Sequence, residues 1–385
     1  MGRTSVRWRS SGRRPGDGSG APTPAYGMGG IDPQNPARLS PRPRRLLWTA
    51  FIGVAVATVI ALISLPYAIL SPGPATNTLG EDSSGTALIE VEGAATYPAD
   101  GALDFTTVSV RGGPDRRINL WGVLAGWLDP DSEVFPVDQL FPRGATSEQI
   151  DEENTIAMTG SQREATAVAL RSLGYEVPEK YVVVGVTKNT PAAEVIEPGD
   201  VVESVDGERV ASITAIQDAI RAKSAGEDVA LTVRRDDEPL EVTATTTESD
   251  GVTVLGIRLN LDFDFPVEVT IHAGDVGGPS AGTMFALAIR DLLTPGSMTG
   301  GKQIAGTGTI DEDAQVGPIG GIRQKVVGAR EAGAEYFLAP AENCEDLSGP
   351  DIPDGLTVVR VATFDEAVDA VEKIAAGEAG LPACA

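Results

Sequence analysis

A serine in a glycine-rich string is the residue of this sequence best placed to act as a nucleophile. The six residues Gly277–Gly282 read Gly-Gly-Pro-Ser-Ala-Gly, follow a strand-like run over 265–271 and precede an amphipathic helical run over 283–293. Glycine allows close backbone approach and Pro279 presets φ ahead of a helix, so we expect Ser280 near a helix N-terminus, where free N–H groups favour negative charge. A serine in such a place ordinarily caps the helix. On these residues alone, a cap and a nucleophile are both open interpretations.

Side chains that could remove the proton of a serine hydroxyl are few. The single histidine, His272, lies eight residues before Ser280 across a glycine-rich loop, and no acid is clearly placed to orient its ring, so we expect it packed at a strand end. Lys302 stands among glycines and is expected in an exposed turn. Lys325 follows two glycines in a helical run, where a lone lysine is ordinarily solvated. One histidine and two cysteines form no metal-ligand cluster, so we expect neither a metal site nor a cofactor.

The length and the net charge limit the number of domains and the kinds of partner that this chain can have. At 385 residues it can hold two or three domains with cores of their own, and its net charge of −25 argues against nucleic acid as a partner. The charge is uneven, since residues 1–45 contain nine arginines, no lysine and only two acidic residues. These residues are also rich in Gly, Pro and Ser, so we expect a disordered tail.

An apolar run without charges follows this arginine-rich segment. Residues 46–70 span twenty-five positions, enough for a hydrocarbon core of about 30 Å, and we predict a transmembrane helix that contacts the lipid bilayer there. Trp48 and Tyr67 stand near its ends, as interfacial aromatic residues often do. A cleaved signal peptide is the alternative, but the run is long for its apolar region. The arginines predict a single-pass protein of the plasma membrane, with a cytoplasmic N-terminus and extracytoplasmic domains after residue 71.

The two cysteines both fall in the part predicted to lie outside the cytoplasm. A disulfide between Cys344 and Cys384 would join the C-terminus to the body of the protein and fits an oxidising compartment. Two free thiols are the alternative, which the spacing leaves open.

An ordered set of segments in the middle of the chain resembles a PDZ domain. A strand-like run from 181 to 186, the string Pro198-Gly-Asp-Val-Val-Glu-Ser-Val-Asp-Gly, a helical run over 213–225 and two further strands succeed one another. The resemblance covers about residues 178–248 and implies a groove for an extended peptide between the first strand and the helix. To that groove the strand would contribute Tyr181, Val182, Val183 and Val184. A rigid spacer or an allosteric module is the alternative role.

Three ordered strings after residue 250 resemble the proteolytic domain of the Lon family. They are Pro279-Ser-Ala-Gly, Thr307-Gly-Thr-Ile and Gly320-Gly-Ile-Arg-Gln-Lys, and the resemblance covers about residues 250–378. It implies that Ser280 is the nucleophile and Lys325 its general base, with Thr307 orienting the lysine amine.

The chemistry of such a pair needs a neutral lysine. A serine hydroxyl is a poor nucleophile until a base takes its proton, and burial among apolar groups lowers the pKa of a lysine toward neutrality. Backbone N–H groups around Gly278 and Ala281 are the expected oxyanion donors, each contributing about 3 kcal/mol.

Together the motifs resemble a bacterial family of membrane-anchored, PDZ domain-containing, Lon-like serine proteases. The expected fold is multidomain α+β, with a single N-terminal transmembrane helix, a PDZ-type β-sandwich or barrel and a Lon-type α+β domain. The expected segments are an arginine-rich cytoplasmic tail at 1–45, the transmembrane helix at 46–70, a stalk and β-rich part at 71–177, the PDZ domain at 178–248, the proteolytic domain at 250–378 and a C-terminal tail at 379–385. Residues 80–175 match no motif, and one hypothesis is that their strands complete the protease domain around an inserted PDZ domain.

The resemblance implies a membrane-tethered serine endopeptidase that acts on unfolded or flexible envelope polypeptides, with the PDZ domain binding or gating the substrate. No ATPase module precedes the domain, and the segment most like a P-loop, residues 296–303, ends in Gln rather than Ser or Thr, so we expect activity without ATP. A hexamer is expected by analogy alone. A catalytically silent PDZ-containing scaffold or adaptor at the outer face of the membrane is the alternative.

Overall fold

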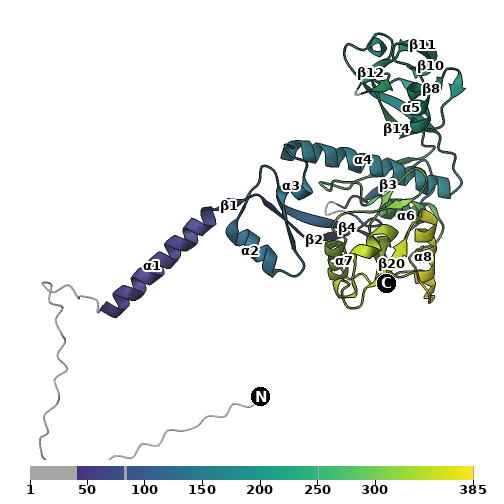
Figure 1. Cartoon of the computed structure of the whole chain (residues 1–385). Helices are drawn as coiled ribbons and strands as arrows, with labels where there is room; N and C mark the ends of the chain where they lie inside the picture. The colour runs from purple at the N-terminus through teal and green to yellow at the C-terminus, as the bar shows by residue number, and fades with distance from the viewer. Residues whose placement is uncertain (1–40, 82–84, 250, 385) are drawn as a thin grey trace, which may run out of the picture. The chain divides into compact units, whose positions relative to one another are not determined.

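The computed structural model describes residues 41–81, 85–249 and 251–384 (Figure 1). Most of the predicted arginine-rich tail, residues 1–40, lies outside the described residues. The first element is helix α1 (Pro41–Leu62), and two strands follow directly, β1 (Ser64–Leu65) and β2 (Tyr67–Asn77).

The structure does not support the predicted transmembrane helix over residues 46–70. The helix ends at Leu62, and residues 67–70 already belong to β2, which pairs with strands on both sides. Ile69 and Leu70 are buried there in the sheet. Across the segments that the structure describes, no helix combines the length and the hydropathy that a membrane span requires. A continuous apolar run does not reveal by itself where a helix gives way to a buried strand.

Strands from both ends of the chain form one six-stranded sheet. Its order is β20-β19-β16-β4-β2-β6; the first four strands are parallel, and β2 pairs antiparallel with β4 and β6. The strands beyond β2 are β4 (Ala102–Gly112), β6 (Glu133–Pro136), β16 (Gln303–Gly306), β19 (Tyr336–Pro340) and β20 (Thr357–Val361). Residues before 137 therefore share a sheet with residues after 302.

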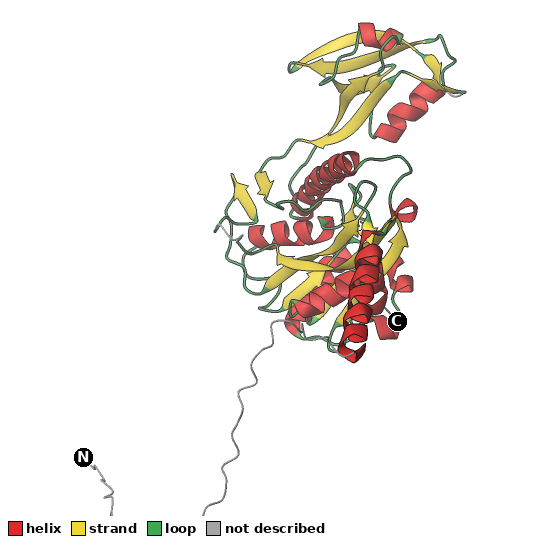
Figure 2. Ribbon diagram, turned by 90° about the vertical axis from the view of Figure 1, so that its left-hand side faces the viewer, coloured by secondary structure: helices red, strands yellow, loops and turns green. Residues whose placement is uncertain are grey.

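Helices cover both faces of this sheet (Figure 2). Side chains alternate along each strand, so Ile304 and Leu338 pack with α6 (Gly282–Leu293) and α8 (Phe364–Ala376), whereas Ala305 and Phe337 pack with α7 (Ile322–Glu331). Helix α6 is the centre of the larger core, since every side chain from 283 to 289 is buried. Helix α4 (Ser147–Ser172) packs against α6.

Helix α4 contains a string that is typical of a helix start but does not begin the helix. The notable string Ser161-Gln-Arg-Glu has the pattern of a capping box, which would open a helix at 161. The capping box that forms lies at residues 146–149. There the Thr146 hydroxyl accepts from the Gln149 N–H, and the Gln149 side chain accepts from the Thr146 N–H. Ser161 consequently lies in the middle of a 26-residue helix, and it is buried.

The segment between α4 and α6 forms a second six-stranded sheet with its own apolar core. The order is β11-β10-β8-β7-β14, with β9 beside β8, and the sheet packs on helix α5 (Ile213–Arg221). Its strands are β7 (Glu179–Val186), β8 (Val201–Val205), β9 (Glu208–Arg209), β10 (Asp228–Arg235), β11 (Glu238–Thr245) and β14 (Ile257–Phe263).

The strand predicted to receive a peptide is not at an edge of this sheet. Strand β7 lies between β8 and β14, and Tyr181 and Val183 are buried, so Tyr181–Val184 cannot pair with an added strand. The edge strand beside α5 is β14, which comes after the helix in the sequence. A cavity of about 330 Å³ lies there, lined by Ile213 and Ile216 of α5 and by residues 252–257.

Short elements complete the fold. They are β3 (Ile89–Glu92), β5 (Ile118–Asn119), α2 (Leu120–Leu128), α3 (Val137–Leu140), β12 (Thr247–Ser249), β13 (Val252–Val254), β15 (Glu268–Ile271), β17 (Thr309–Ile310) and β18 (Val316–Gly317), with 3₁₀ turns at Pro191–Glu194, Ala341–Asp346 and Gly349–Asp351.

Candidate active site

Ser280 lies just before α6, and its hydroxyl does not cap that helix. The N-cap residue of α6 is Ala281, and no side chain caps it. The Ser280 hydroxyl instead forms a hydrogen bond of 2.7 Å with the Nζ atom of Lys325. Of the two interpretations that the string allowed, the geometry therefore favours the nucleophile.

Lys325 is a buried lysine in the first turn of α7. Only 2% of its surface is exposed, and no carboxylate among the described residues forms an ion pair with it. Burial penalises the charged ammonium and lowers the pKa of Lys325 from 10.5 to about 7. Its second partner is the hydroxyl of Thr307, 2.8 Å from Nζ. A substantial fraction of Lys325 is thus neutral near pH 7 and able to accept a proton.

Helix α7 reaches this position because glycines allow close packing. Gly321 precedes the helix with φ of 70°, in the left-handed region, and a Cβ at Gly328 would lie 2.5 Å from the carbonyl oxygen of Gly73 in β2. The loop before α7 is fixed by Asn343, whose side chain accepts from the N–H of Ile319 and donates to its carbonyl oxygen. The backbone on both sides of α7 is therefore held in place.

The backbone of the serine is fixed from the side of the sheet. The carbonyl oxygen of Ser280 accepts from the Thr307 hydroxyl and from the Gly308 N–H, both at 2.8 Å. Thr307 is fully buried, and its hydroxyl contacts both the Ser280 carbonyl oxygen and the Lys325 amine, which is the contact that an orienting role would require.

The other side of the serine loop is held by α4. The Ser161 hydroxyl donates to the carbonyl oxygen of Pro279 at 2.9 Å, and the Gly278 N–H donates to the carbonyl oxygen of Asn154 at 2.9 Å. The expectation that Gly278 supplies an oxyanion donor is thus wrong for this arrangement, because its N–H is already used. Within the described residues the Ala281 N–H makes no backbone hydrogen bond, so it remains suited to that role.

A cavity of about 700 Å³ opens at the Ser280–Lys325 pair. Apolar side chains from four parts of the N-terminal half line it, namely Leu70 of β2, Phe105, Val108 and Val110 of β4, Leu140 and Phe141 at α3, and Ile150 and Met158 of α4. Polar groups on its wall include Glu153 and Asp275. The site is consequently shaped for an apolar side chain of a bound chain.

The remaining candidate bases do not reach Ser280. The side chain of His272 is 40% exposed and lies 3.5 Å from Glu90, which differs from the predicted packed position. Lys302 directly follows the turn at residues 298–301, is half-buried rather than fully exposed, and pairs with Glu335 at 3.8 Å. The part of the chain that the structure describes holds no cluster of three or more metal-ligating side chains.

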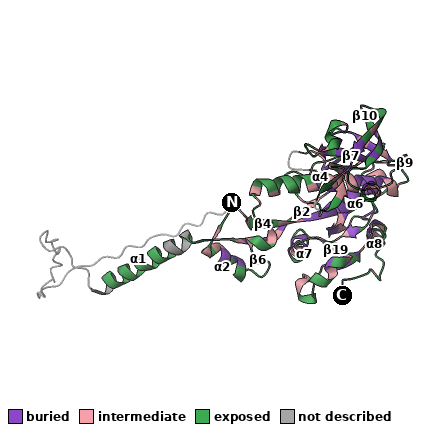
Figure 3. Cartoon of the chain, turned by 45° about the horizontal axis from the view of Figure 1, so that its top comes forward, coloured by how far each residue is buried: buried purple, intermediate pink, exposed green. Residues whose placement is uncertain are grey.

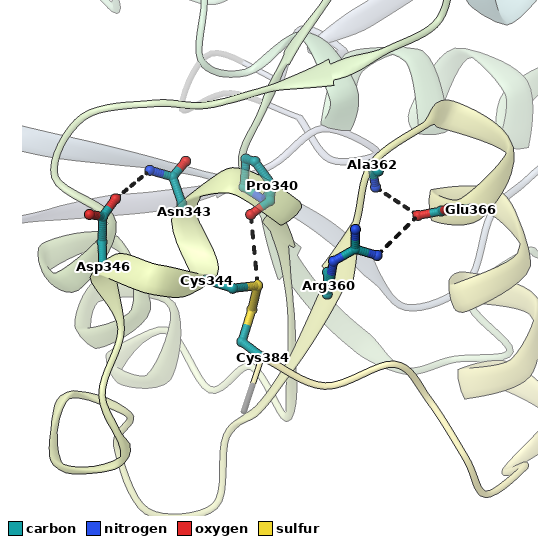
Figure 4. Close-up of a disulfide and its surroundings, with 8 residues drawn as sticks. All are labelled: Pro340, Asn343, Cys344, Asp346, Arg360, Ala362, Glu366 and Cys384. Atoms are coloured by element: carbon teal, nitrogen blue, oxygen red, sulfur yellow. Dashed lines mark hydrogen bonds and ion pairs between the residues drawn. A yellow bond between two sulfur atoms is a disulfide. The ribbon is translucent and has the colours of Figure 1, made fainter.

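Cys344 and Cys384 form a disulfide (Figure 4). The bond joins the 3₁₀ turn after β19 to the C-terminal segment, and the Cys384 N–H donates to Val358 of β20. Of the two alternatives for the cysteines, the structure therefore has the disulfide.

The sequence did not indicate that residues 105–161 contribute side chains to the site. Ser161, Asn154 and the apolar cavity residues stand in none of the catalytic motifs, and they reach Ser280 only through the pairing of β4 with β16 and the packing of α4 on α6. The hypothesis of an N-terminal part that completes the protease domain was the one available signal.

Two family profiles match the chain. Residues 156–246 match the PDZ domain, and residues 256–375 match the C-terminal proteolytic domain of Lon protease (S16). Strand β14 falls within the second match by sequence, although it belongs to the PDZ sheet. The chain thus carries a PDZ domain and a Lon-type serine peptidase domain, and the candidate dyad lies in the latter.

Curated relatives cover the same region. Lon protease 1 of Bacillus subtilis is 32% identical over 121 residues, which are 30% of this chain and 15% of the relative. The Lon protease of Fusobacterium nucleatum is 35% identical over 152 residues, 35% of this chain and 19% of the relative. The chain therefore spans less than a fifth of the length of these relatives. Among solved structures, the PDZ domain of an SdrC-like protein from Listeria monocytogenes is 27% identical, with a TM-score of 0.20, over 20% of this chain and 85% of that one.

Proposed function

We propose that this chain is a serine endopeptidase that cleaves unfolded or flexible polypeptides through the dyad of Ser280 and Lys325. The observation that carries the proposal is the 2.7 Å contact between the serine hydroxyl and the amine of a lysine whose pKa burial lowers to about 7. A general base has to be within hydrogen-bond reach of the proton it removes and to have a pKa near the working pH. Lys325 meets both conditions.

The reaction follows from the positions of these groups. As Ser280 Oγ attacks the peptide carbonyl carbon, its proton passes to the neutral Nζ of Lys325, and we expect the Ala281 N–H to stabilise the oxyanion. The ammonium of Lys325 then gives the proton to the departing amine, which leaves an acyl-enzyme on Ser280. Water attacks that ester by the same route, with Lys325 again accepting a proton, and the carboxylic acid product leaves with Ser280 restored.

The proposed substrates are chains that need no mechanical unfolding. The serine and the lysine are already in contact in this structure, so no domain movement is needed to assemble the dyad. We therefore expect cleavage of flexible chains without ATP, while stably folded proteins should resist.

The decisive experiment compares three full-length proteins on unfolded casein and on a folded control protein. Wild type should cleave casein without ATP, and Ser280→Ala and Lys325→Ala should each reduce kcat by about 10³-fold or more. Equal cleavage by all three would exclude this dyad, and no cleavage by wild type would favour the silent scaffold. Cleavage of the folded control only when ATP is added would contradict ATP independence.

The PDZ domain is proposed to bind an extended segment of the substrate along β14. That strand is the free edge beside α5, and apolar residues line the adjacent cavity. An Ile213→Asp substitution should raise KM for casein and leave the cleavage of a ten-residue peptide unchanged. An unchanged KM for casein would favour the spacer role.

The folded domains are proposed to act outside the cytoplasm. A disulfide such as Cys344–Cys384 persists in oxidising compartments and is rare in the cytosol. Alkaline phosphatase fused after the last residue of the chain should therefore be active in cells, whereas a green fluorescent protein at the same position should remain dark. The opposite pattern would place the domains in the cytoplasm.

A further inference from the structure

Strand β4 has a neighbouring strand on only one side over its second half. Its parallel pairing with β16 ends at Phe105, whereas its antiparallel pairing with β2 continues to Gly112. Burial changes at the same place, since residues 103–106 are buried and residues 109–111 are exposed. In the part of the chain that the structure describes, β4 therefore has a free edge over residues 107–112, as only the outermost strands of a sheet ordinarily do.

The backbone groups of Val108 and Val110 point toward this free edge. The carbonyl oxygen of Thr107 lies against β2, and that of Ser109 accepts from the Ser71 hydroxyl of β2 at 3.4 Å. Backbone groups alternate in direction along a strand, so those of Val108 and Val110 point away from β2. Among the described residues, neither of these two makes a backbone hydrogen bond outside the sheet. Their N–H and C=O groups are therefore available to a further strand.

The cavity at the dyad runs along this edge. Val108 and Val110 line the cavity beside Ser280, and a smaller cavity of about 180 Å³ lies further along the strand at Gly112. The two cavities share four lining residues, namely Val110, Phe141, Ile150 and Asn154. Another wall is the start of α4, where every residue from 151 to 156 is exposed (Figure 3). One continuous groove therefore joins Ser280 to the end of β4.

We propose that the substrate binds as an extended strand along residues 107–112 of β4, on one side of the bond to be cleaved. The continuity of the groove with Ser280 identifies its occupant as a flexible polypeptide, and in this the inference rests on the proposed function. Hydrogen bonds to the main chain supply the affinity in such binding, so chains of many sequences can be held. At about 3.4 Å per residue, the free edge accommodates about five substrate residues. Val110, which is 46% exposed, would be covered by the added strand.

The test measures how a fluorescein-labelled ten-residue peptide of alanine, threonine and leucine binds to full-length protein with Ser280→Ala and Ile213→Asp. The first substitution prevents cleavage and the second disables the PDZ groove, so the measurement needs no turnover and reports on β4. Adding Val110→Pro removes an N–H from the free edge and no hydrogen bond to β2, which a proline at a strand edge allows. Val110→Thr keeps the N–H and is the matched control. The Val110→Pro protein should bind about tenfold more weakly than the Val110→Thr protein, because one hydrogen bond is lost.

Two methylated peptides test the same contact without any change at β4, and so do not depend on the folding of the Val110→Pro protein. Methyl groups on alternate backbone nitrogens leave one edge of the peptide intact, whereas the same number on consecutive nitrogens blocks both edges. We expect the first peptide to bind and the second to lose binding. Equal binding of the two peptides, or no binding of the unmethylated peptide, would overturn the proposal. If the expected pattern is found but wild type does not cleave casein, the groove stands and the peptidase proposal fails.

Discussion

At the scale of single residues, Lys325 determines the pH range in which this site can work. The neutral amine is the form that accepts the serine proton, and burial places its pKa at about 7. We therefore expect kcat/KM for an unfolded substrate to fall about tenfold per pH unit below pH 7 and to level off above pH 8. A Lys325→Arg protein should be inactive throughout, because a guanidinium cannot be deprotonated in this range. A flat profile between pH 5 and pH 8 would mean that another group is the base.

The same residue should cost the protein stability. The pKa of Lys325 is about 7 in the folded state and 10.5 as its ordinary value, so between these pH values the unfolded state binds more protons. The free energy of unfolding should then rise with pH across this window, and below pH 7 the penalty is fully present. Relative to the Lys325→Met protein, the free energy of unfolding of wild type should rise by up to about 1.4 kcal/mol per pH unit. Urea unfolding of both proteins at pH 7, 8 and 9 measures this difference. A constant difference between the two proteins would contradict the lowered pKa.

Ser161 is a residue that positions the nucleophile without touching a substrate. Its hydroxyl holds the Pro279 carbonyl, so Ser161→Ala should allow the serine loop to move and reduce kcat by about tenfold, with little change in KM. Thr159→Ala is the matched control, because that hydroxyl is exposed and bonds only within α4. Equal effects of the two substitutions would show that the loss comes from the helix and not from the loop contact.

At the scale of elements, two helical glycines should respond oppositely to the same change. A Cβ at Gly160 of α4 meets nothing within 4 Å, and alanine there should stabilise the protein by about 0.5–1 kcal/mol. A Cβ at Gly328 of α7 would lie 2.5 Å from the Gly73 carbonyl oxygen, so alanine there should destabilise it by about 1–3 kcal/mol and displace Lys325. Urea unfolding of both proteins, with activity as a second measurement, checks the pair. Stabilisation by Gly328→Ala would show that α7 and β2 are less closely packed.

Elements from the N-terminal half should also set the choice of substrate. Phe141 lines the cavity beside Ser280 together with other apolar side chains, so peptides with leucine at the cleaved position should be preferred over those with aspartate. Phe141→Ser should reduce the rate for the leucine peptide by about tenfold and leave the aspartate peptide unaffected. Parallel losses for both peptides would indicate a general disturbance of the site.

Residues in short local motifs of this sequence could be predicted, whereas the pairing of strands from distant segments could not. Ser280, Thr307 and Lys325 could be predicted because each lies in a short pattern whose backbone demands are local. The end of α1 could not, since residues 46–70 are uncharged and mostly apolar, and only the partners β4 and β6 make 67–70 a strand. The peptide edge was misplaced for the same reason, because which strand of a sheet is outermost depends on pairing between distant segments.

At the scale of the whole molecule, the disulfide should bind the end of the chain to the catalytic domain. Cys344 and Cys384 are separated by 40 residues and pack in the core that also contains Val326 of α7 and Phe337 of β19. Closing a loop of that length should stabilise the folded state by about 4 kcal/mol. We expect a reducing agent to lower the free energy of unfolding by about this amount in wild type. The Cys344→Ala, Cys384→Ala protein should be equally destabilised and indifferent to the agent. Because this core supports α7, the loss of the bond should lower the temperature at which cleavage of casein stops, while the rate at low temperature stays close to that of wild type. An unchanged unfolding midpoint on reduction would show that the C-terminal segment is held by its backbone bonds to β20 alone.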